Sequence, residues 1–205
     1  MSPRFKTLLQ ELAERKIAGP SATLTSIHLA LALDTIGRSA VGRAKLAQDL
    51  KMGEGATRTI IKRLKNARLV QTSIAGLALT SEGHDVWKEF TSNFRETSIE
   101  SNELSNSPCN NAVLVRHQAT KVTSGMEQRD AAIMTGARNA TTILCSKGRL
   151  VIPSISENVK RDFPEAGKMI IRLLSPEDGD VIIVSGAESC EKARYGAFAA
   201  AWTLA

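Results

Sequence analysis

The residues with the clearest binding chemistry lie in the stretch 54–66, EGATRTIIKRLKN. Its less polar side chains recur every three or four residues, the period of one helix face: Thr57, Ile60, Ile61 and Leu64. Cationic groups occupy other faces: Arg58, Lys62, Arg63 and Lys65. Arginine pairs bidentately with guanine, and both residue types bind phosphate. We expect a helix that packs through its apolar side and binds an anionic partner through its cationic side.

Two flanking elements position this helix. A short helix over 43–51 carries apolar residues at matching spacing, and a glycine-containing turn, 52–55, joins the two as in a helix-turn-helix. Two strand-like runs follow, 69–73 and 77–80, around a reversal with glycine at its tip. The pattern therefore predicts helix, turn, basic helix and hairpin in that order.

The segment GRAKLAQDLKMGEGATRTIIKRLKNARLVQTSIAGLALT, residues 42–80, resembles the winged helix-turn-helix of prokaryotic transcription regulators. The resemblance implies that the second helix enters the major groove of DNA and that the hairpin, the wing, contacts the flanking backbone or minor groove. Those proteins usually have glycine after the second helix, where φ is positive. Arg68 stands at that position, which leaves the angle of the wing open.

The hypothesis assigns a role to each polar residue of this segment. The residues expected to face base edges are Glu54, Ala56, Arg58, Thr59 and Lys62. The residues expected to hold phosphates are Arg38, Arg43, Lys45, Arg63 and Lys65, and the wing tip is Ser73 to Gly76. Arg58 is the favoured residue for a bidentate contact to guanine.

The distribution of charge agrees with this assignment. The chain of 205 residues has a net charge of +6. Residues 37–79 contain nine basic and two acidic side chains, whereas residues 101–205 contain twelve basic and eleven acidic ones. A charge run is commonly only a solvated face, but its coincidence with the motif favours nucleic acid as the partner.

Three further helices complete an expected DNA-binding domain over residues 1–94. They are a helix over 3–17 ended by Gly19-Pro20, an apolar helix capped by Thr23 or Thr25 and ending near Gly37, and a helix over 81–94 capped by Thr80 or Ser81. The first is either a packing strut or a dimerisation helix. The aromatic residues of the third, such as Trp87 and Phe90, favour core packing over base stacking, and His28 is expected to be a core histidine.

Residues 95–111 are rich in Ser, Asn and Glu, which predicts a linker before a second domain at 112–205. The predicted strands are 112–116, 141–145, 149–152 and 180–185, with a further apolar run at 168–174 assigned as a strand. Helices are predicted over 124–135, opened by a capping box of Ser124 and Glu127, and over 188–204. The fold class is therefore multi-domain α+β, with a winged helix-turn-helix followed by a two-layer α+β domain whose antiparallel sheet has helices on one face.

Three segments resemble a family of uncharacterised archaeal two-domain proteins: GEGATRTIIKRLKNARLV, QRDAAIMTGARNATTILC and GDVIIVSGAESCEKARYGAFAAAWTL. That family pairs a winged-helix module with a C-terminal domain of unknown function. The resemblance implies a DCoH-like fold for the second half, a fold also found in a domain inserted in bacterial aspartyl-tRNA synthetases. It implies no ligand.

The second half offers weak binding chemistry only. Ser185, Gly186 and Ser189 lie where a strand passes into a helix and could cradle an anion, although Ser185 and Glu188 also fit a plain capping box. Arg138 lies at another helix-to-strand turn. We find no nucleophile–base set, no metal-ligand spacing and no cofactor motif, and therefore expect no enzyme.

Three widely spaced cysteines, 109, 145 and 190, lack a CxxC pair, which favours free thiols in a reducing compartment over a disulfide scaffold. No apolar run is long enough for a membrane span, and no signal sequence is found, so the expected location is the cytoplasm.

The leading hypothesis is a sequence-specific transcription regulator that binds double-stranded DNA as a homodimer, with the second domain sensing a small-molecule effector or mediating assembly. The alternative is a module that binds RNA or a ribonucleoprotein. Aromatic residues make up only 4% of the chain, which leaves few platforms for unstacked bases.

Overall fold

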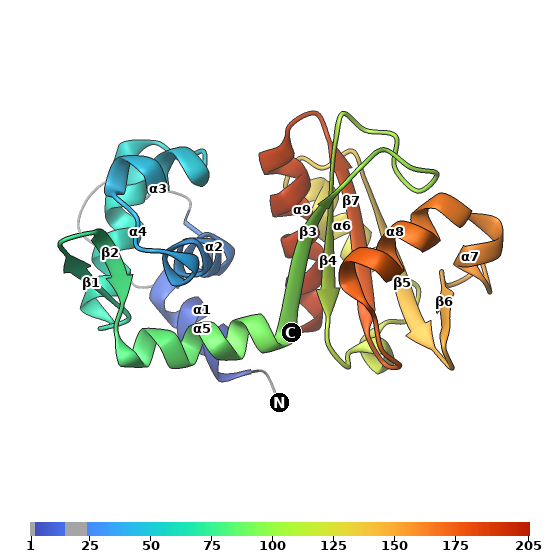
Figure 1. The fold of residues 1–205 in the computed structure, drawn as a ribbon, viewed down its shortest axis with the longest axis horizontal. Coiled ribbons are helices and arrows are strands. Elements are labelled where there is room, and N and C mark those ends of the chain that lie inside the picture. Colours follow the sequence, from blue (N-terminus) through green and yellow to red (C-terminus); the bar gives the residue numbers. More distant parts are fainter. Residues whose placement is uncertain (1–2, 15–23) are drawn as a thin grey trace. The chain divides into compact units, whose positions relative to one another are not determined.

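The computed structural model describes residues 3–14 and 24–205 of the chain. The chain divides into two compact units, Met1–Ser92 and Asn93–Ala205, and each is described by itself (Figure 1). The predicted end of the first helix at Gly19-Pro20 lies outside the described residues.

The first unit has the predicted order of helices with a hairpin before the last one. Its described elements are α1 (Arg4–Glu14), α2 (Ser26–Arg38), α3 (Arg43–Asp49), α4 (Glu54–Asn66), β1 (Val70–Ser73), β2 (Gly76–Leu79) and α5 (Ser81–Asn93). Its core is apolar because each helix buries the face that the sequence period marks, including Leu46 of α3 and Ile60 and Leu64 of α4. The winged helix-turn-helix part of the fold class is confirmed.

Arg68 performs the role that glycine usually has after the second helix. Its φ is +58°, in the left-handed region. Its backbone N–H donates to Lys65 O at 2.9 Å, and the N–H of Leu69 donates to Leu64 O at 2.9 Å. These bonds satisfy carbonyls at the helix end and turn the chain directly into β1. The helix therefore does not run on past this point.

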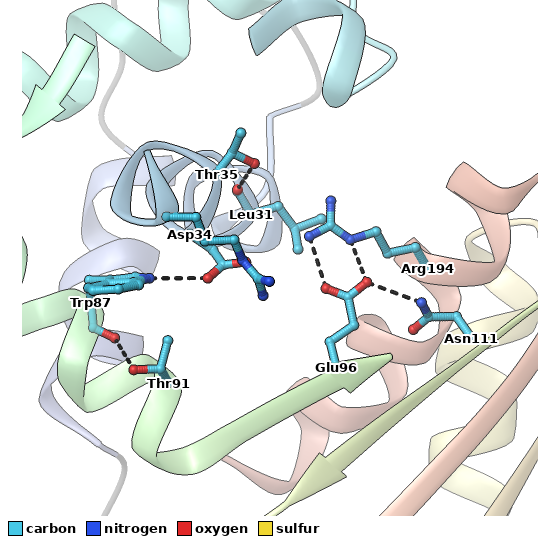
Figure 2. Close-up of polar contacts among 9 residues, drawn as sticks. Leu31, Asp34, Thr35, Trp87, Thr91, Glu96, Asn111 and Arg194 are labelled. Carbon is cyan, nitrogen blue, oxygen red and sulfur yellow. Dashed lines mark hydrogen bonds and ion pairs between the residues drawn. The ribbon is translucent and has the colours of Figure 1, made fainter. Parts of the chain in front are cut away.

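A buried aspartate ties α2 to α5, which sequence analysis did not anticipate. Figure 2 shows Asp34 accepting a hydrogen bond from Trp87 Nε1 at 3.1 Å, and Arg38 Nε lies 2.9 Å from the other carboxylate oxygen. The Trp87 ring lies so close to Gly37 that a Cβ there would approach it to 2.6 Å. Phe90 packs edge-on against Phe5 with ring centroids 5.7 Å apart. The aromatic residues of α5 are thus packing groups, as predicted.

The second unit is built on one antiparallel sheet. Its described elements are β3 (Phe94–Ile99), β4 (Cys109–Val115), a 3-10 turn η1 (Ala119–Lys121), α6 (Met126–Met134), β5 (Asn139–Ser146), β6 (Arg149–Val151), α7 (Val159–Asp162), α8 (Pro164–Leu174), β7 (Val181–Ala187) and α9 (Cys190–Leu204). The strand order is β3-β4-β7-β5-β6, with every neighbouring pair antiparallel. The predicted α+β class with an antiparallel sheet is confirmed.

The sheet carries helices on both faces, where sequence analysis expected them on one (Figure 1). Alternate strand residues such as Leu114 and Ile182 pack with Ile170 of α8 and Val159 of α7. The opposite face receives α9 and α6: Ser185 of β7 lies against Gly196 of α9, where a Cβ would meet its Oγ at 2.9 Å.

Two segments differ from their predicted structure. The run 168–174 is part of helix α8, because its apolar residues belong to a longer 3.6-residue pattern that starts after Pro164 and buries Ala166, Ile170 and Leu174. Residues 95–111 are not a linker throughout: β3 pairs with β4 from Phe94↔Val115 to Ile99↔Asn110. An edge strand can be this polar because the sheet covers only part of it.

Helix starts in the second unit also differ from the predicted capping boxes. Helix α6 starts at Met126, whose N–H donates to Ser124 Oγ, and its N-cap is Gly125. Helix α9 starts at Cys190, and Ser189 caps it by accepting from Lys192 N–H.

Cys109 and Cys190 form a disulfide, so the expectation of three free thiols was wrong. The two residues are 81 positions apart in the chain. They meet because β4 pairs with β7 in a register that places Cys109 opposite Ala187, three residues before Cys190. Cys145 is the remaining thiol; it is buried, and burial together with the nearby Asp178 and Asp180 carboxylates raises its pKa.

Ion pairs stabilise the second unit from within. Arg194 binds the Glu96 carboxylate through Nε and Nη2 at 2.7 and 2.9 Å, and Asn111 Nδ2 donates to the same carboxylate at 3.1 Å (Figure 2). Asp180, which is fully buried, accepts from Arg116 Nη1 at 2.7 Å and from the N–H groups of His117 and Glu177 at 3.0 and 2.9 Å. No helix in the described part of the chain is long and apolar enough to cross a membrane.

Candidate nucleic-acid interface

Helix α4 presents a buried and an open face, as the sequence period predicts. Thr57, Ile60, Ile61 and Leu64 are buried. Arg58 and Lys62 are exposed one helical turn apart, and the described residues give neither side chain a hydrogen bond or an ion pair. Glu54 is exposed in the first turn. The three charged members of the expected base-reading set therefore lie in water.

Two smaller members of the predicted base-reading set are less open. Ala56 and Thr59 are half-buried, and Thr59 Oγ1 donates to Gly55 O at 3.0 Å. This bond within the helix leaves the hydroxyl oxygen able to accept but orients its proton inward. Arg58 and Lys62 are consequently the stronger candidates for contacts with bases.

Arg63 does not lie on the open face. Its Nη1 donates to Leu12 O at 2.8 Å and also to Ala13 O, so it holds the carboxyl end of α1 against α4. A guanidinium used in this way satisfies helix carbonyls that have no partner within α1. In this structure Arg63 therefore packs α1 against α4, and its predicted contact with phosphate stays a prediction.

Three other predicted phosphate ligands have partners within the unit. Arg38 pairs with buried Asp34, and Lys45 Nζ lies 2.6 Å from Asp49 of the same helix. Lys65 Nζ hydrogen bonds to Thr72 Oγ1, which joins the end of α4 to the wing. All three side chains remain largely exposed, so these contacts restrict their positions without removing them from solvent.

The wing is fixed at its base. Val41 and Leu77 exchange two backbone hydrogen bonds, of 3.1 and 2.8 Å, so the segment before α3 forms a short bridge to β2. Gly76 has a φ of +120°, and a Cβ there would lie 2.7 Å from Val41 O. Ser73 Oγ donates to Gly76 O at 3.0 Å and closes the turn. The predicted wing-tip residues therefore form a braced turn.

A groove of about 290 Å³ lies between α4 and the wing. Its lining is Arg43, Arg58, Ile61, Lys65, Thr72, Gly76 and Leu77. Three cations and no carboxylate line it, and the described residues give Arg43 no ion pair or hydrogen bond. The sequence pattern did not mark Thr72, Ile61 and Leu77 as members of this surface. The alternation of residues in β1 and β2 predicts which side chains share a face of the hairpin. The folded structure is needed to show that this face lies against α4.

The weaker ligand residues of the second unit are not assembled around an open site. Ser185 is fully buried in β7 and its Oγ donates to Asn139 O at 3.2 Å. Gly186 is also buried in β7 and accepts from Arg138 N–H at 2.8 Å. The Arg138 guanidinium forms an ion pair with Glu188, and Ser189 is used as a helix cap. These contacts explain the residues as structural groups.

Comparisons with known proteins agree with the two-unit organisation. Residues 33–93 match the family model of the CggR N-terminal DNA binding domain, and residues 107–204 match a domain of unknown function (DUF4443). The hypothetical protein PH0730 from Pyrococcus horikoshii OT3 has a similar solved structure, with a TM-score of 0.72 and 24% identity over 87% of this chain and 91% of that chain. That likeness shows the fold. The search of curated proteins found no match.

The match over residues 33–93 includes α3, α4, the wing and α5, and it supports a DNA-binding regulator. The match assigns no role to single residues. The cationic surface described above lies within the matched segment.

Proposed function

We propose that the protein is a sequence-specific transcription regulator that places α4 in the major groove of double-stranded DNA. The observation that carries the proposal is the set of exposed cations without a partner among the described residues, Arg43, Arg58 and Lys62, on the motif that matches a DNA-binding domain. A major groove admits one α-helix, and guanidinium groups on it pair with guanine O6 and N7. Arg58 and Lys62 are therefore assigned to bases.

The groove between α4 and the wing is assigned to the phosphate backbone. Arg43 and Lys65 supply the charge, and the Lys65–Thr72 contact holds the ammonium group at the groove wall. Arg38 and Lys45 are further phosphate ligands at its margin, where their ion pairs limit their contribution. Contacts between these cations and phosphates raise the affinity for every DNA sequence alike, whereas contacts to bases discriminate between sequences.

The finer parts of the proposal concern assembly and sensing. A homodimer allows two copies of α4 to contact half-sites one helical turn apart, which is the usual arrangement for this class of reader. The second unit then mediates assembly or senses an effector. Sedimentation of the full chain, with and without DNA, measures the first point directly: one duplex with two protein chains supports the dimer, and a one-to-one complex contradicts it.

The alternative, an RNA-binding module, receives less support from the structure. Sequence-specific RNA recognition relies on aromatic side chains that stack on unpaired bases. No Phe, Tyr or Trp side chain in residues 3–14 and 24–205 is exposed, and Phe5, Phe90, Phe94, Phe198 and Trp202 are buried. The described surface therefore offers charge without an exposed Phe, Tyr or Trp ring on which bases could stack.

Selection of genomic fragments with the purified full chain at stated salt tests the proposal. We expect one enriched motif, tighter binding to its duplex than to structured RNA, and loss of enrichment in Arg58→Ala. The matched control is Arg172→Ala, which removes an exposed arginine from α8 in the second unit. Tighter binding to RNA, or fragments recovered equally by wild type and Arg58→Ala, contradicts the proposal.

A further inference from the structure

The wing differs from the rest of the interface in having no charge. Residues 69–79, LVQTSIAGLAL, contain no acidic and no basic side chain. The neighbouring helix α4 contains four basic residues in thirteen. A wing that holds phosphates by charge carries lysine or arginine, so this wing must contact DNA in another way if it contacts it at all.

The tip of the wing is an isoleucine with its whole side chain in water. Ile74 lies in the two-residue turn between β1 and β2, and among the large apolar side chains of the described chain it is the most exposed. It contributes nothing to the core of the unit. Its burial by a partner would therefore be a net gain for binding.

The backbone at the tip of the wing is fixed by hydrogen bonds on both sides of the turn. Ser73 pairs with Gly76 across the turn, and Ser73 Oγ adds a side-chain hydrogen bond to Gly76 O. Immediately below, Leu77 is bonded to Val41 through two backbone hydrogen bonds. Little conformational freedom is left to be lost when Ile74 meets a partner.

The position of the groove indicates what that partner is. Arg43, Arg58 and Lys65 line the groove together with Thr72 and Gly76 of the wing. If α4 enters the major groove as proposed, a phosphate backbone bound in this groove would separate that major groove from the adjacent minor groove. The tip of the wing would then lie on the minor-groove side of that backbone.

We propose, on the basis of the proposed function, that Ile74 is an apolar wedge that enters this minor groove and partly unstacks one base step. Apolar side chains inserted between base steps bend DNA and read how easily it deforms. Ile74 is then a specificity-determining residue: the preferred sequence has a flexible pyrimidine–purine step beneath the wing, at a position where no side chain reads a base edge.

The test uses the full chain and a duplex recovered by genomic selection, with 2-aminopurine replacing single adenines in the flanks. Wild type is expected to raise the fluorescence at one flanking step. Ile74→Ala is expected to abolish that rise and to weaken binding about five- to twentyfold, because a wedge acts through burial. Ile74→Leu is expected to keep both the fluorescence rise and the wild-type affinity. Ile155→Ala, which removes an exposed isoleucine from the second unit, changes neither.

The salt dependence of binding distinguishes a wedge from a phosphate contact. Ile74→Ala must leave the slope of log K against log salt unchanged, whereas Arg43→Ala lowers it by about 0.9. Thermal unfolding of Ile74→Ala should equal wild type because the side chain is exposed. An unchanged affinity and fluorescence in Ile74→Ala, or a reduced slope, overturns the wedge while the proposed function stands. Failure of wild type to bind any duplex overturns both.

Discussion

The two units use charged side chains in different ways. In the second unit the charges largely neutralise one another: Arg194 with Glu96, Arg116 with Asp180, Arg138 with Glu188, Arg161 with Asp162. In the first unit the excess is +7 over residues 37–79, and the described structure gives Arg43, Arg58 and Lys62 no partner. Pairs with a buried carboxylate, such as Arg116 with Asp180, support the fold, whereas unpaired exposed charges remain available to a ligand. Charge removal should therefore affect stability in one unit and binding in the other.

The largest effect is expected at Asp180. Replacing Asp180 with alanine removes the carboxylate that Arg116 and two backbone N–H groups bind inside the second unit. Leaving these groups without an acceptor should lower the free energy of unfolding of that unit by about 3 to 5 kcal/mol. Denaturant unfolding followed by residue-resolved hydrogen exchange measures it.

The matched control for Asp180 is Asp130→Ala, since Asp130 is exposed and its one ion pair among the described residues is with its neighbour Arg129. Its effect should stay below about 1 kcal/mol. Duplex affinity of the folded protein should be unchanged in both variants. Equal destabilisation by the two substitutions would show that the buried pair contributes no more than a surface one.

The disulfide should give the next largest effect, again in the second unit alone. Reduction, or Cys109→Ser, opens a covalent link between β4 and α9 and should lower that unit's free energy of unfolding by about 2 to 4 kcal/mol. Residues 1–92 contain no cysteine, so hydrogen exchange there serves as the internal control. If a reducing agent further destabilises Cys109→Ser, the effect comes from somewhere other than this bond.

Arg58→Ala should show the reverse behaviour. The side chain is exposed and has no partner among the described residues, so thermal unfolding should stay within about 0.5 kcal/mol of wild type. Loss of a bidentate contact to guanine should weaken specific binding by about 1 to 3 kcal/mol. Fluorescence anisotropy with the selected duplex measures this, and Arg172→Ala should match wild type. Destabilisation by Arg58→Ala would mean that the charge supports the fold instead.

The smallest effect is a pH dependence in the first unit. His28 Nδ1 accepts from Thr25 N–H at 3.2 Å in a capping box at the start of α2, which requires the neutral ring. Burial lowers the pKa of His28 below its usual 6.5. The unfolded chain therefore takes up a proton that the folded chain resists, so stability falls as pH drops below about 6.5.

We expect the loss at His28 to reach about 0.5 to 1 kcal/mol, the usual contribution of a helix cap. Exchange rates of α2 amides between pH 7.5 and 5.5 measure it. His28→Gln keeps a capping acceptor without titrating and should remove this part of the pH dependence. An unchanged pH profile in His28→Gln would assign the effect to another group.

Sequence patterns predicted the first unit better than the second because its elements are amphipathic and locally capped. Residues 54–66 have a clear helical period, and Thr25 provides a local start signal for α2. The open positions of Arg58 and Lys62 follow from the same period. The positive φ of Arg68 could not be predicted, since glycine is the usual signal for it.

The sequence-based predictions that differ from the structure concern features set by contacts between residues distant in sequence. The sequence of β3 resembles a polar linker because an edge strand buries few of its side chains. Only its pairing with β4 in the structure identifies it as a strand. Cys109 and Cys190 meet only through the β4–β7 register. Arg63 and Arg58 are both arginines of α4, but the carboxyl end of α1 lies beside Arg63, and its Leu12 carbonyl accepts a hydrogen bond from the Arg63 side chain. Patterns on one helix cannot distinguish a cation that binds a ligand from one that binds a neighbouring helix.

The central claim is that the open cations of the first unit bind the phosphates and bases of duplex DNA. The most direct measurement is the affinity of the full chain for one selected duplex between about 50 and 300 mM salt, compared with the variant Arg43→Ala/Lys65→Ala, which removes two of the proposed phosphate contacts. We predict a steep negative slope of log K against log salt for wild type, flattened by about two units in the variant. Equal slopes for the two proteins, or an affinity independent of salt, would contradict the account.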